Sequence, residues 1–247
     1  MAKNILVQSV FLLFILPHIL AENYDFLQRC DKNDPNIDDC MLRSANLALP
    51  HLLKGNPKLG LPSFLPWKFL KYVYGSNDTV SITVEKGIIH GLEETNITNI
   101  KWNMDQRHIN VQMFMPKIYG ISDYIADGYF MDHKFSGKGV MFQILDEFQA
   151  QLDVDYEVNE NGYATVTNVG YDMNFEKLTI YLQGLYNGEE TNSLINQNLR
   201  TFYEIFEPVK RKAGAHVMGQ IFKSVFQTNT IDSLFISKPL NGIKKEL

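Results

Sequence analysis

A long helical repeat near the C-terminal end sets the size of any fold that this sequence can adopt. Through residues 190–226, apolar side chains recur every three or four positions, which is the spacing of one face of an α-helix. They are Ile195, Leu199, Phe202, Phe206, Val209, Ala213, Val217, Ile221 and Val225. One helix of this length measures about 55 Å, which exceeds the width of a compact domain of this size. The sequence therefore predicts an elongated protein, with a bend at Pro208, whose ring nitrogen carries no hydrogen.

The middle of the chain changes to the two-residue period of β-strands. Apolar residues alternate with polar ones in two clear runs, 80–85 and 109–115. Further strands are predicted at 140–144, 152–158, 164–169 and 178–182. Turns are predicted at 136–139 and 159–162, and a closing strand that returns to this sheet at 231–236. These runs predict a long antiparallel sheet with one wet face, so the fold class is α+β.

The segment before this sheet predicts one short helix and an irregular crossing. Asp34 and Pro35 suit the N-cap and the first position of an amphipathic helix. Pro50 should kink this helix or end it early, because proline removes a backbone hydrogen bond. The following stretch, 55–67, is rich in Gly and Pro and is predicted to be irregular.

The first residues predict entry into the secretory pathway. A short apolar run from Val10 to Leu16, followed by the small residue Ala21, is typical of a signal peptide cleaved after residues 1–21. The run is shorter than the roughly 20 residues that a membrane helix needs, so we expect no stable membrane insertion. Residues 22–247 carry no low-complexity linker and are predicted to form a single domain.

Cysteines, sequons and charge agree with secretion. Cys30 and Cys40 are the only cysteines, and in an oxidising compartment they should form a disulfide. Asn77 and Asn96 each begin a sequon and are candidate glycosylation sites. The formal net charge of −5 repels phosphate backbones, so nucleic acid is not expected as a partner.

The order of several short motifs resembles one family. They are Cys30 and Cys40, Leu59-Gly60-Leu61-Pro62, Gly87-Ile88-Ile89-His90-Gly91-Leu92, Tyr129 with Ser136-Gly137-Lys138-Gly139, Leu185-Tyr186-Asn187-Gly188, and Asn196-Gln197-Asn198. In this order the chain resembles the insect takeout and haemolymph juvenile-hormone-binding protein family. The resemblance implies a highly curved antiparallel sheet wrapped around the long helix, like one module of the tubular lipid-binding superfamily. It also implies an apolar tunnel, and it leaves hormone transport, feeding and circadian output open as roles.

The residues offer no recognisable catalytic or metal site, so we predict a non-enzyme with no cofactor and no metal. The stretch from Gly120 to Asp123 lacks the closing glycine of an esterase nucleophile elbow. The histidines are scattered without the spacing of metal ligands. Asp153 and Asp155 fall on the wet face of a strand rather than in a site. A lipid-modifying enzyme is therefore disfavoured.

Side chains that face the inside of the sheet are candidates for ligand contact, although plain core packing explains the same pattern. On the strands they are Ile109, Val111, Met113, Met115 and Phe142. On the helix they are Phe202, Phe206, Val209 and Ala213. Phe64 and Trp67 are assigned to the mouth of the tunnel. A polar group, either Tyr129 or a buried hydroxyl or amide, is expected to orient the head of the ligand.

Together these features predict a secreted extracellular carrier, in haemolymph or a similar fluid, that buries one small hydrophobic ligand. The resemblance implies a terpenoid such as a juvenile hormone, or a long-chain acyl or isoprenoid lipid. We expect a monomer, and the role leaves room for a cell-surface receptor. Two alternatives stay open, an interaction protein whose core is filled by its own side chains and a lipocalin-like carrier. The Gly-x-Trp signature of lipocalins is missing, since Leu65 and Ile100 precede Trp67 and Trp102.

Overall fold

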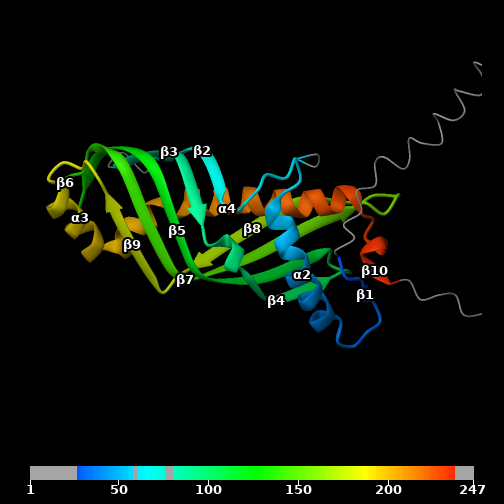
Figure 1. Cartoon of the computed structure of the whole chain (residues 1–247). Coiled ribbons are helices and arrows are strands. Elements are labelled where there is room, and N and C mark those ends of the chain that lie inside the picture. Colours follow the sequence, from blue (N-terminus) through cyan, green and yellow to red (C-terminus); the bar gives the residue numbers. More distant parts are fainter. Residues whose placement is uncertain (1–26, 58–59, 76–79, 237–247) are drawn as a thin grey trace, which may run out of the picture.

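The computed structural model describes residues 27–57, 60–75 and 80–236, which form a large antiparallel sheet and three helices (Figure 1). The principal strands are β2 (Trp67–Gly75), β3 (Val80–His90), β4 (Asn96–Asn103), β5 (His108–Phe130), β7 (Gly137–Val158), β8 (Ala164–Asn174) and β9 (Lys177–Leu182). The helices are α2 (Ile37–Lys54), α3 (Gly188–Gln197) and α4 (Leu199–Thr228). Shorter elements are β1 (Cys30–Asp31), β6 (His133–Lys134), β10 (Phe235–Ile236), and the 3-10 turns η3 (Leu92–Glu94) and η4 (Asp232–Leu234).

Two very long strands make the sheet elongated. β5 and β7 pair antiparallel from His108 opposite Asp155 to Ala126 opposite Gly137. Each takes two shorter partners end to end, since β4 and β3 pair with β5, and β8 and β9 pair with β7. The sheet curves around α4, which lies along it and packs against β8 (Figure 1). The predicted α+β class, with a curved antiparallel sheet and a long C-terminal helix, is confirmed.

The edges of this sheet separate it from a lipocalin. The strand path runs β2-β3-β5-β7-β8, and within the described residues β2 and β8 do not pair with each other. A lipocalin barrel closes on itself and has no free edges of this kind. The open sheet therefore excludes the lipocalin-like alternative.

An irregularity shared by β5 and β7 decides which side chains face the helix. From Ile109 to Met115 the buried residues of β5 are odd-numbered, whereas from Ile118 to Phe130 they are even-numbered. The change falls at Pro116, which has no amide hydrogen to give to a neighbouring strand. β7 changes phase at Glu147, which has a φ of 52° and precedes Phe148, the partner of Met115. Inward positions in the two halves of the sheet therefore follow opposite parity.

The predicted single helix over 190–226 is wrong, because Asn198 separates α3 from α4. Asn198 leaves the helical conformation at φ −124°, and its side-chain amide donates to the Leu194 carbonyl oxygen at 2.9 Å. Its own carbonyl oxygen accepts the Phe202 N–H at 3.0 Å and so begins α4. The remaining helix has 30 residues, with Pro208 inside it, and measures about 45 Å.

The N-terminal helix differs from the prediction at both ends. α2 begins at Ile37, because the Asp34 side chain accepts the Asn36 N–H at 2.8 Å and shapes the turn before the helix instead of capping it. The helix also continues past Pro50 to Lys54. Of the two effects predicted for Pro50, a kink or an early end, the early end is therefore wrong.

A single asparagine ties this helix to the sheet. The Asn46 side-chain amide donates to the Ile97 carbonyl oxygen at 2.8 Å, and its oxygen accepts the Ile97 N–H at 2.9 Å. Ile97 belongs to β4, so these two hydrogen bonds hold α2 against that end of the sheet.

Several strand boundaries also need correction. The predicted strands at 140–144 and 152–158 are both parts of β7, and the predicted turn at 136–139 overlaps its first residues. The chain turns earlier, at Met131 and Asp132, where φ is 50° and 63°. The predicted turn at 159–162 is confirmed by the bond from the Gly162 N–H to the Asn159 carbonyl oxygen. β2 and β4 were not predicted.

The closing strand does not return to the large sheet. β10 pairs in parallel with β1, so Phe235 lies opposite Cys30. Cys30 is joined to Cys40 by the expected disulfide, with a Cα–Cα distance of 5.9 Å. The two ends of the described chain and the start of α2 are therefore fastened together at one end of the molecule (Figure 1).

Candidate functional site

An apolar cavity lies between the inner face of the sheet and α4. This central cavity has a volume of about 200 Å³ and is lined by side chains from α2, from β2, β3, β5, β7 and β8, and from α4. A second cavity of about 170 Å³, here the end cavity, lies toward β1 and α2. The two share the side chains Leu49, Met113, Met218 and Ile221. They therefore adjoin along the length of the helix, and together they reach the lower part of the roughly 300–1,000 Å³ range of small-molecule sites.

The composition of the wall explains why the helix leaves space open. α4 presents Ala213 and Gly214 to the central cavity, and a Cβ at Gly214 would lie 2.4 Å from the Tyr171 ring. Gly214 therefore lets the helix approach Tyr171 of β8 closely, while the one-carbon side chain of Ala213 fills little of the cavity beside it. The wall also contains five methionines, whose flexible thioethers adapt to irregular ligands: Met113, Met115, Met141, Met173 and Met218.

One charged side chain lines the central cavity among these apolar groups. Lys210 of α4 places its ammonium 4.3 Å from the centre of the Tyr203 ring. Burial lowers the pKa of Lys210 to about 8, because the uncharged amine is easier to remove from water. Burial likewise raises the pKa of Tyr72 and of Tyr171 in the same wall, so both phenols stay neutral at physiological pH.

The structure brings most of the predicted contact residues to the two cavities. Those that line the central cavity are Phe64, Trp67, Met113, Met115 and Ala213. Ile109 and Val111 line the end cavity together with Met113. Trp67 begins β2 rather than lying in an irregular segment.

Two predicted helix residues fill space instead of bordering it. Phe202 and Phe206 are buried, and their ring centres are 5.0 Å apart. Phe202 also contacts the rings of Phe130 and Phe135, at 5.3 and 5.6 Å. This aromatic cluster packs the far end of the molecule, and neither cavity includes it. Val209 is half-buried on α4 and is not part of either wall.

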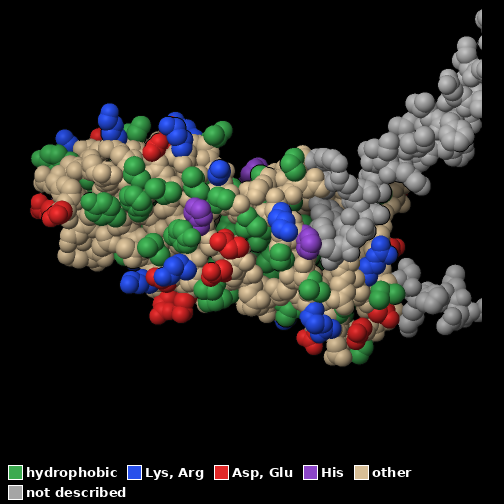
Figure 2. Space-filling view, in the orientation of Figure 1, with side chains coloured by type: hydrophobic (Ala, Val, Ile, Leu, Met, Phe, Trp, Pro, Cys, Tyr) green, Lys and Arg blue, Asp and Glu red, His purple; other side chains and the backbone are tan. Residues whose placement is uncertain are grey.

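Tyr129 and Phe142 face away from both cavities. Tyr129 is 60% exposed and Phe142 is 43% exposed, because both lie beyond the phase change at Pro116 and its partner position. In that half of the sheet, odd residues of β5 and even residues of β7 point outward. Figure 2 shows hydrophobic side chains gathered on this outer face, over β5, β7 and β9. The structure thus offers no geometry by which Tyr129 could orient a ligand in either cavity.

The sequence analysis missed several wall residues. Leu49 and Leu53 come from α2, and Tyr171 comes from β8. Their apolar periodicity was visible, but nothing in the sequence placed those elements against α4. Lys210 was missed because the candidate contact residues on the helix were chosen from its apolar side chains alone. A lysine so close to the repeat of Phe206 and Ala213 was the available signal.

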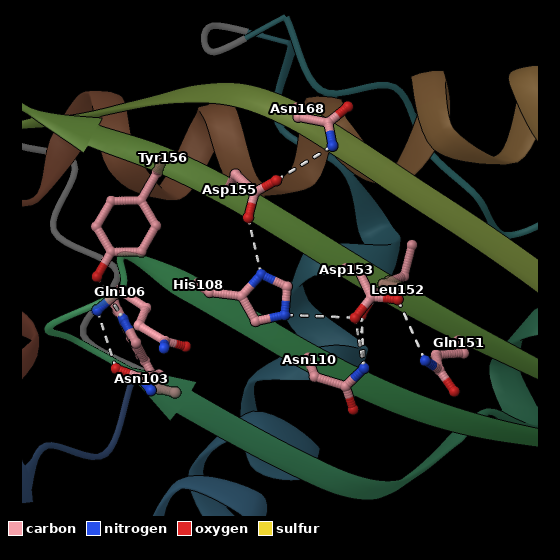
Figure 3. A network of polar contacts seen from close by, with 11 residues as sticks. Asn103, Gln106, His108, Asn110, Gln151, Leu152, Asp153, Asp155, Tyr156 and Asn168 are labelled. Carbon is pink, nitrogen blue, oxygen red and sulfur yellow. Dashed lines mark hydrogen bonds and ion pairs between the residues drawn. The ribbon is translucent and has the colours of Figure 1, made fainter.

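A second arrangement of chemistry-bearing side chains among the described residues is a polar network on the outer face (Figure 3). His108 Nδ1 lies 2.8 Å from Asp155 Oδ1, and its Nε2 lies 3.4 Å from Asp153 Oδ1. The hydrogen bond from His108 keeps the pKa of Asp155 below its ordinary value. Asn110 and Asn168 donate to these carboxylates at 2.7 and 3.1 Å.

This network has the histidine and carboxylate of a hydrolase but no nucleophile. Among the described residues, the hydrogen-bond and ion-pair partners of the His108 ring are the two carboxylates, and no hydroxyl or thiol bonds to it. The part of the chain that the structure describes also contains no cluster of His, Cys, Asp and Glu side chains that suits a metal. The geometry fits a network of surface charges better than a catalytic centre.

Residues 1–21 and Asn77 lie outside the described residues. Asn96 is exposed at the first position of β4. None of the helices in the described ranges has the length and apolar character to cross a bilayer.

Comparison with known proteins identifies the family. The sequence matches the family described as haemolymph juvenile hormone binding protein over residues 9–236. Among solved structures, it resembles Takeout 1 of Epiphyas postvittana with a TM-score of 0.72 and 22% identity, over 82% of this chain and 96% of that chain. A lipopolysaccharide binding protein gives a TM-score of 0.39 at 12% identity, over 78% of this chain and 38% of that chain. No curated protein matches the sequence. Because the family match spans most of the chain and the Takeout 1 structure has the same fold, this chain belongs to the haemolymph juvenile hormone binding protein family.

Proposed function

We propose that this protein carries one small hydrophobic ligand in the central cavity, with the end cavity taking the rest of a long molecule. The observation that carries this proposal is the pair of adjoining apolar cavities along α4, of about 200 and 170 Å³. The family name supports it, because members are described by hormone binding. The ligand class is a terpenoid such as a juvenile hormone, or a long-chain acyl or isoprenoid lipid.

Burial alone can supply the affinity. A ligand of about 20 non-hydrogen atoms that loses a few hundred Å² to the cavity gains several kcal/mol at about 25 cal/mol per Å². Part of this gain is lost to restricted motion of the ligand, so a Kd in the micromolar to submicromolar range is expected. The protein needs no chemical step for this role, and we propose that it is not an enzyme.

We further propose that the protein is a secreted monomer. The disulfide between Cys30 and Cys40 supports an oxidising compartment, and the exposed side chain of Asn96 is accessible for glycosylation. The apolar leader over residues 1–21 points the same way. Haemolymph or a similar extracellular fluid would supply the aqueous phase through which a carrier is useful.

Native mass spectrometry of the secreted protein tests the proposal. The expected result is a complex with one apolar small molecule, which solvent extraction then identifies. An empty protein that also fails to take up farnesyl and long-chain acyl probes would contradict the carrier function. That outcome would favour an interaction protein, for which the aromatic cluster around Phe202 already shows how the core can be filled.

A further inference from the structure

We propose that the ligand of the central cavity is a long-chain carboxylic acid whose carboxylate pairs with the Lys210 ammonium. This inference rests on the carrier function proposed above and narrows its ligand class. It starts from the place of one cation. Lys210 is the only charged residue that lines the central cavity within the described chain, and the other wall residues are apolar or neutral.

The carboxylates near Lys210 form ion pairs with a different residue. Arg211, the next residue of α4, contacts Glu207 at 2.7 Å and Asp172 at 2.7 Å. Within the described residues Lys210 forms no ion pair, and its ammonium lies over the face of the Tyr203 ring. The sequence thus places two cations side by side, and the helix turns one toward surface acids and the other toward the cavity.

Lys210 is mostly but not fully buried. An ammonium in such a place without a carboxylate is costly unless something in the site compensates for its lost hydration. The ring of Tyr203 compensates in part through its negative face. A ligand carboxylate would compensate more fully, because the attraction between opposite charges is strong where water is excluded. An ester or an alcohol could accept a hydrogen bond from Lys210 but would leave its charge unmatched.

The wall also fits the shape of such a ligand. Lys210 is a single point charge with rotatable donors, which suits a monoanion better than a phosphate that carries two charges. Gln143 offers a side-chain amide to the same cavity. Beyond the head group, the shared residues Met113 and Met218 lead from the central cavity into the apolar end cavity, where an alkyl chain would lie.

The test compares ligands that share a chain but differ in the head group. Dodecanoic acid, dodecan-1-ol and methyl dodecanoate are titrated into the full-length secreted protein after removal of bound lipid, with displacement of a fluorescent apolar probe as the readout. The acid is expected to bind at least tenfold more tightly than the alcohol and the ester. Equal affinities for the three would overturn the proposal for Lys210 while leaving the carrier function intact. Failure of all three to displace the probe would instead count against the carrier function.

Two lysine variants test whether Lys210 is the cause of the tighter binding of the acid. Lys210→Met keeps an unbranched side chain but removes the charge, and it should lower the affinity for the acid by about tenfold without changing that for the alcohol. Lys212→Met is the matched control, because Lys212 is exposed on the same helix and lines neither cavity. Unchanged acid binding in Lys210→Met, or an equal loss in Lys212→Met, would overturn the assignment.

A pH series on the wild-type protein gives a readout that depends on no variant. The acid should bind less tightly as the pH rises through 8, because the free protein then loses the proton of Lys210, whereas the alcohol should not. The other titratable groups in the wall are Tyr72, Tyr171 and Tyr203, and outside it lie Arg211, Glu207 and Asp172. The pKa of Tyr72 and of Tyr171 is raised, so neither titrates before Lys210. Acid binding that stays constant from pH 7 to 9 would contradict the pairing.

Discussion

At the scale of single residues, Lys210 should lower the folding stability of the ligand-free protein. Its pKa is about 8 in the folded chain, against 10.5 ordinarily, so the unfolded state binds its proton more strongly. The loss of folding free energy caused by the charged Lys210 is fully present below pH 8. It disappears as the pH rises to about 10.5. Because the side chain is partly exposed, we discount the full shift and expect Lys210→Met to stabilise the ligand-free protein by about 1–2 kcal/mol at pH 7.

Urea denaturation of ligand-free protein at pH 7 and pH 10 measures this difference. The gain from Lys210→Met should shrink at the higher pH, because the lysine of the folded wild-type protein is then neutral and most of its destabilising effect is gone. A variant that is less stable than wild type at pH 7 would show that the ammonium already has a stabilising partner. The exposed control Lys212→Met should change stability by less than about 0.5 kcal/mol.

A second residue-scale prediction concerns the close approach of β7 to the chain just after β9. Gly139 lies at the start of β7, and a Cβ there would stand 2.1 Å from the Gln183 carbonyl oxygen. Backbone cannot move aside as a flexible side chain can, so Gly139→Ala should cost about 1–3 kcal/mol in the free energy of unfolding. Gly188→Ala is the control, because nothing lies within 4 Å of that position. Equal stability of the two variants in chemical denaturation would refute the steric explanation.

Gly139 also shows why the sequence misled us about a turn. The run Ser136-Gly137-Lys138-Gly139 has the composition of a hairpin loop. The glycines instead make room for the chain after β9, where the Gln183 N–H donates to the Val140 carbonyl oxygen at 2.9 Å. Local composition can indicate that glycine is required, but it does not distinguish a turn from a close contact with a distant segment.

At the scale of elements, the phase change in β5 and β7 limits how far inward residues can be predicted. Alternation correctly placed Ile109, Val111, Met113 and Met115 inside, because they lie on one side of Pro116. The same alternation does not hold beyond Pro116 in β5 or beyond the matching position in β7. Tyr129 and Phe142 therefore lie on the outer face. Periodicity is a local signal, and a one-residue slip reverses every side chain beyond it.

The helix region shows the same limit in another form. The apolar spacing from Ile195 to Val225 continues through Asn198 without interruption. The break becomes visible only when the Asn198 side chain bonds back to Leu194 and its backbone begins a second helix. The asparagine side chain competes in this way for backbone hydrogen-bond partners, so Asn198 was a possible sign of a helix end. Asparagine also occurs inside helices, so its presence alone does not predict a break.

The disulfide supports a prediction for the terminal elements. It closes a loop of about ten residues between β1 and α2, so the Cys30→Ser/Cys40→Ser double variant should lose about 2–3 kcal/mol on the chain-entropy model. The loss should be visible as faster amide exchange in α2 and at β10, which pairs with β1. Unchanged exchange at Phe235 together with full stability would mean that the β1–β10 pairing holds without the bond. Buffer with a reductant should reproduce the variant's behaviour in the wild-type protein.

At the scale of the whole molecule, the sequence predicted the outline better than the interior. A helix too long for a globule requires an equally long partner, and the paired strands β5 and β7 meet that requirement. Inward-facing positions do not reveal whether the space between is filled. Met113 borders both cavities while Phe202 belongs to a packed cluster, although both were predicted as contact residues by the same rule. Which of them touches open space depends on the combined packing of three helices and the sheet.

This difference between filled and open space can be tested by blocking the central cavity. Ala213→Phe adds a ring where α4 borders the open volume, so the protein should stay folded while losing at least tenfold in affinity for its ligand. Ile125→Phe adds a ring on the outer face, where the side chain is 56% exposed, and serves as the control. Ligand at about 100 times Kd should stabilise the wild type and Ile125→Phe by about 2.7 kcal/mol and Ala213→Phe by much less. Equal stabilisation of all three proteins in thermal denaturation would place the ligand outside the central cavity, and the carrier role would then need another site.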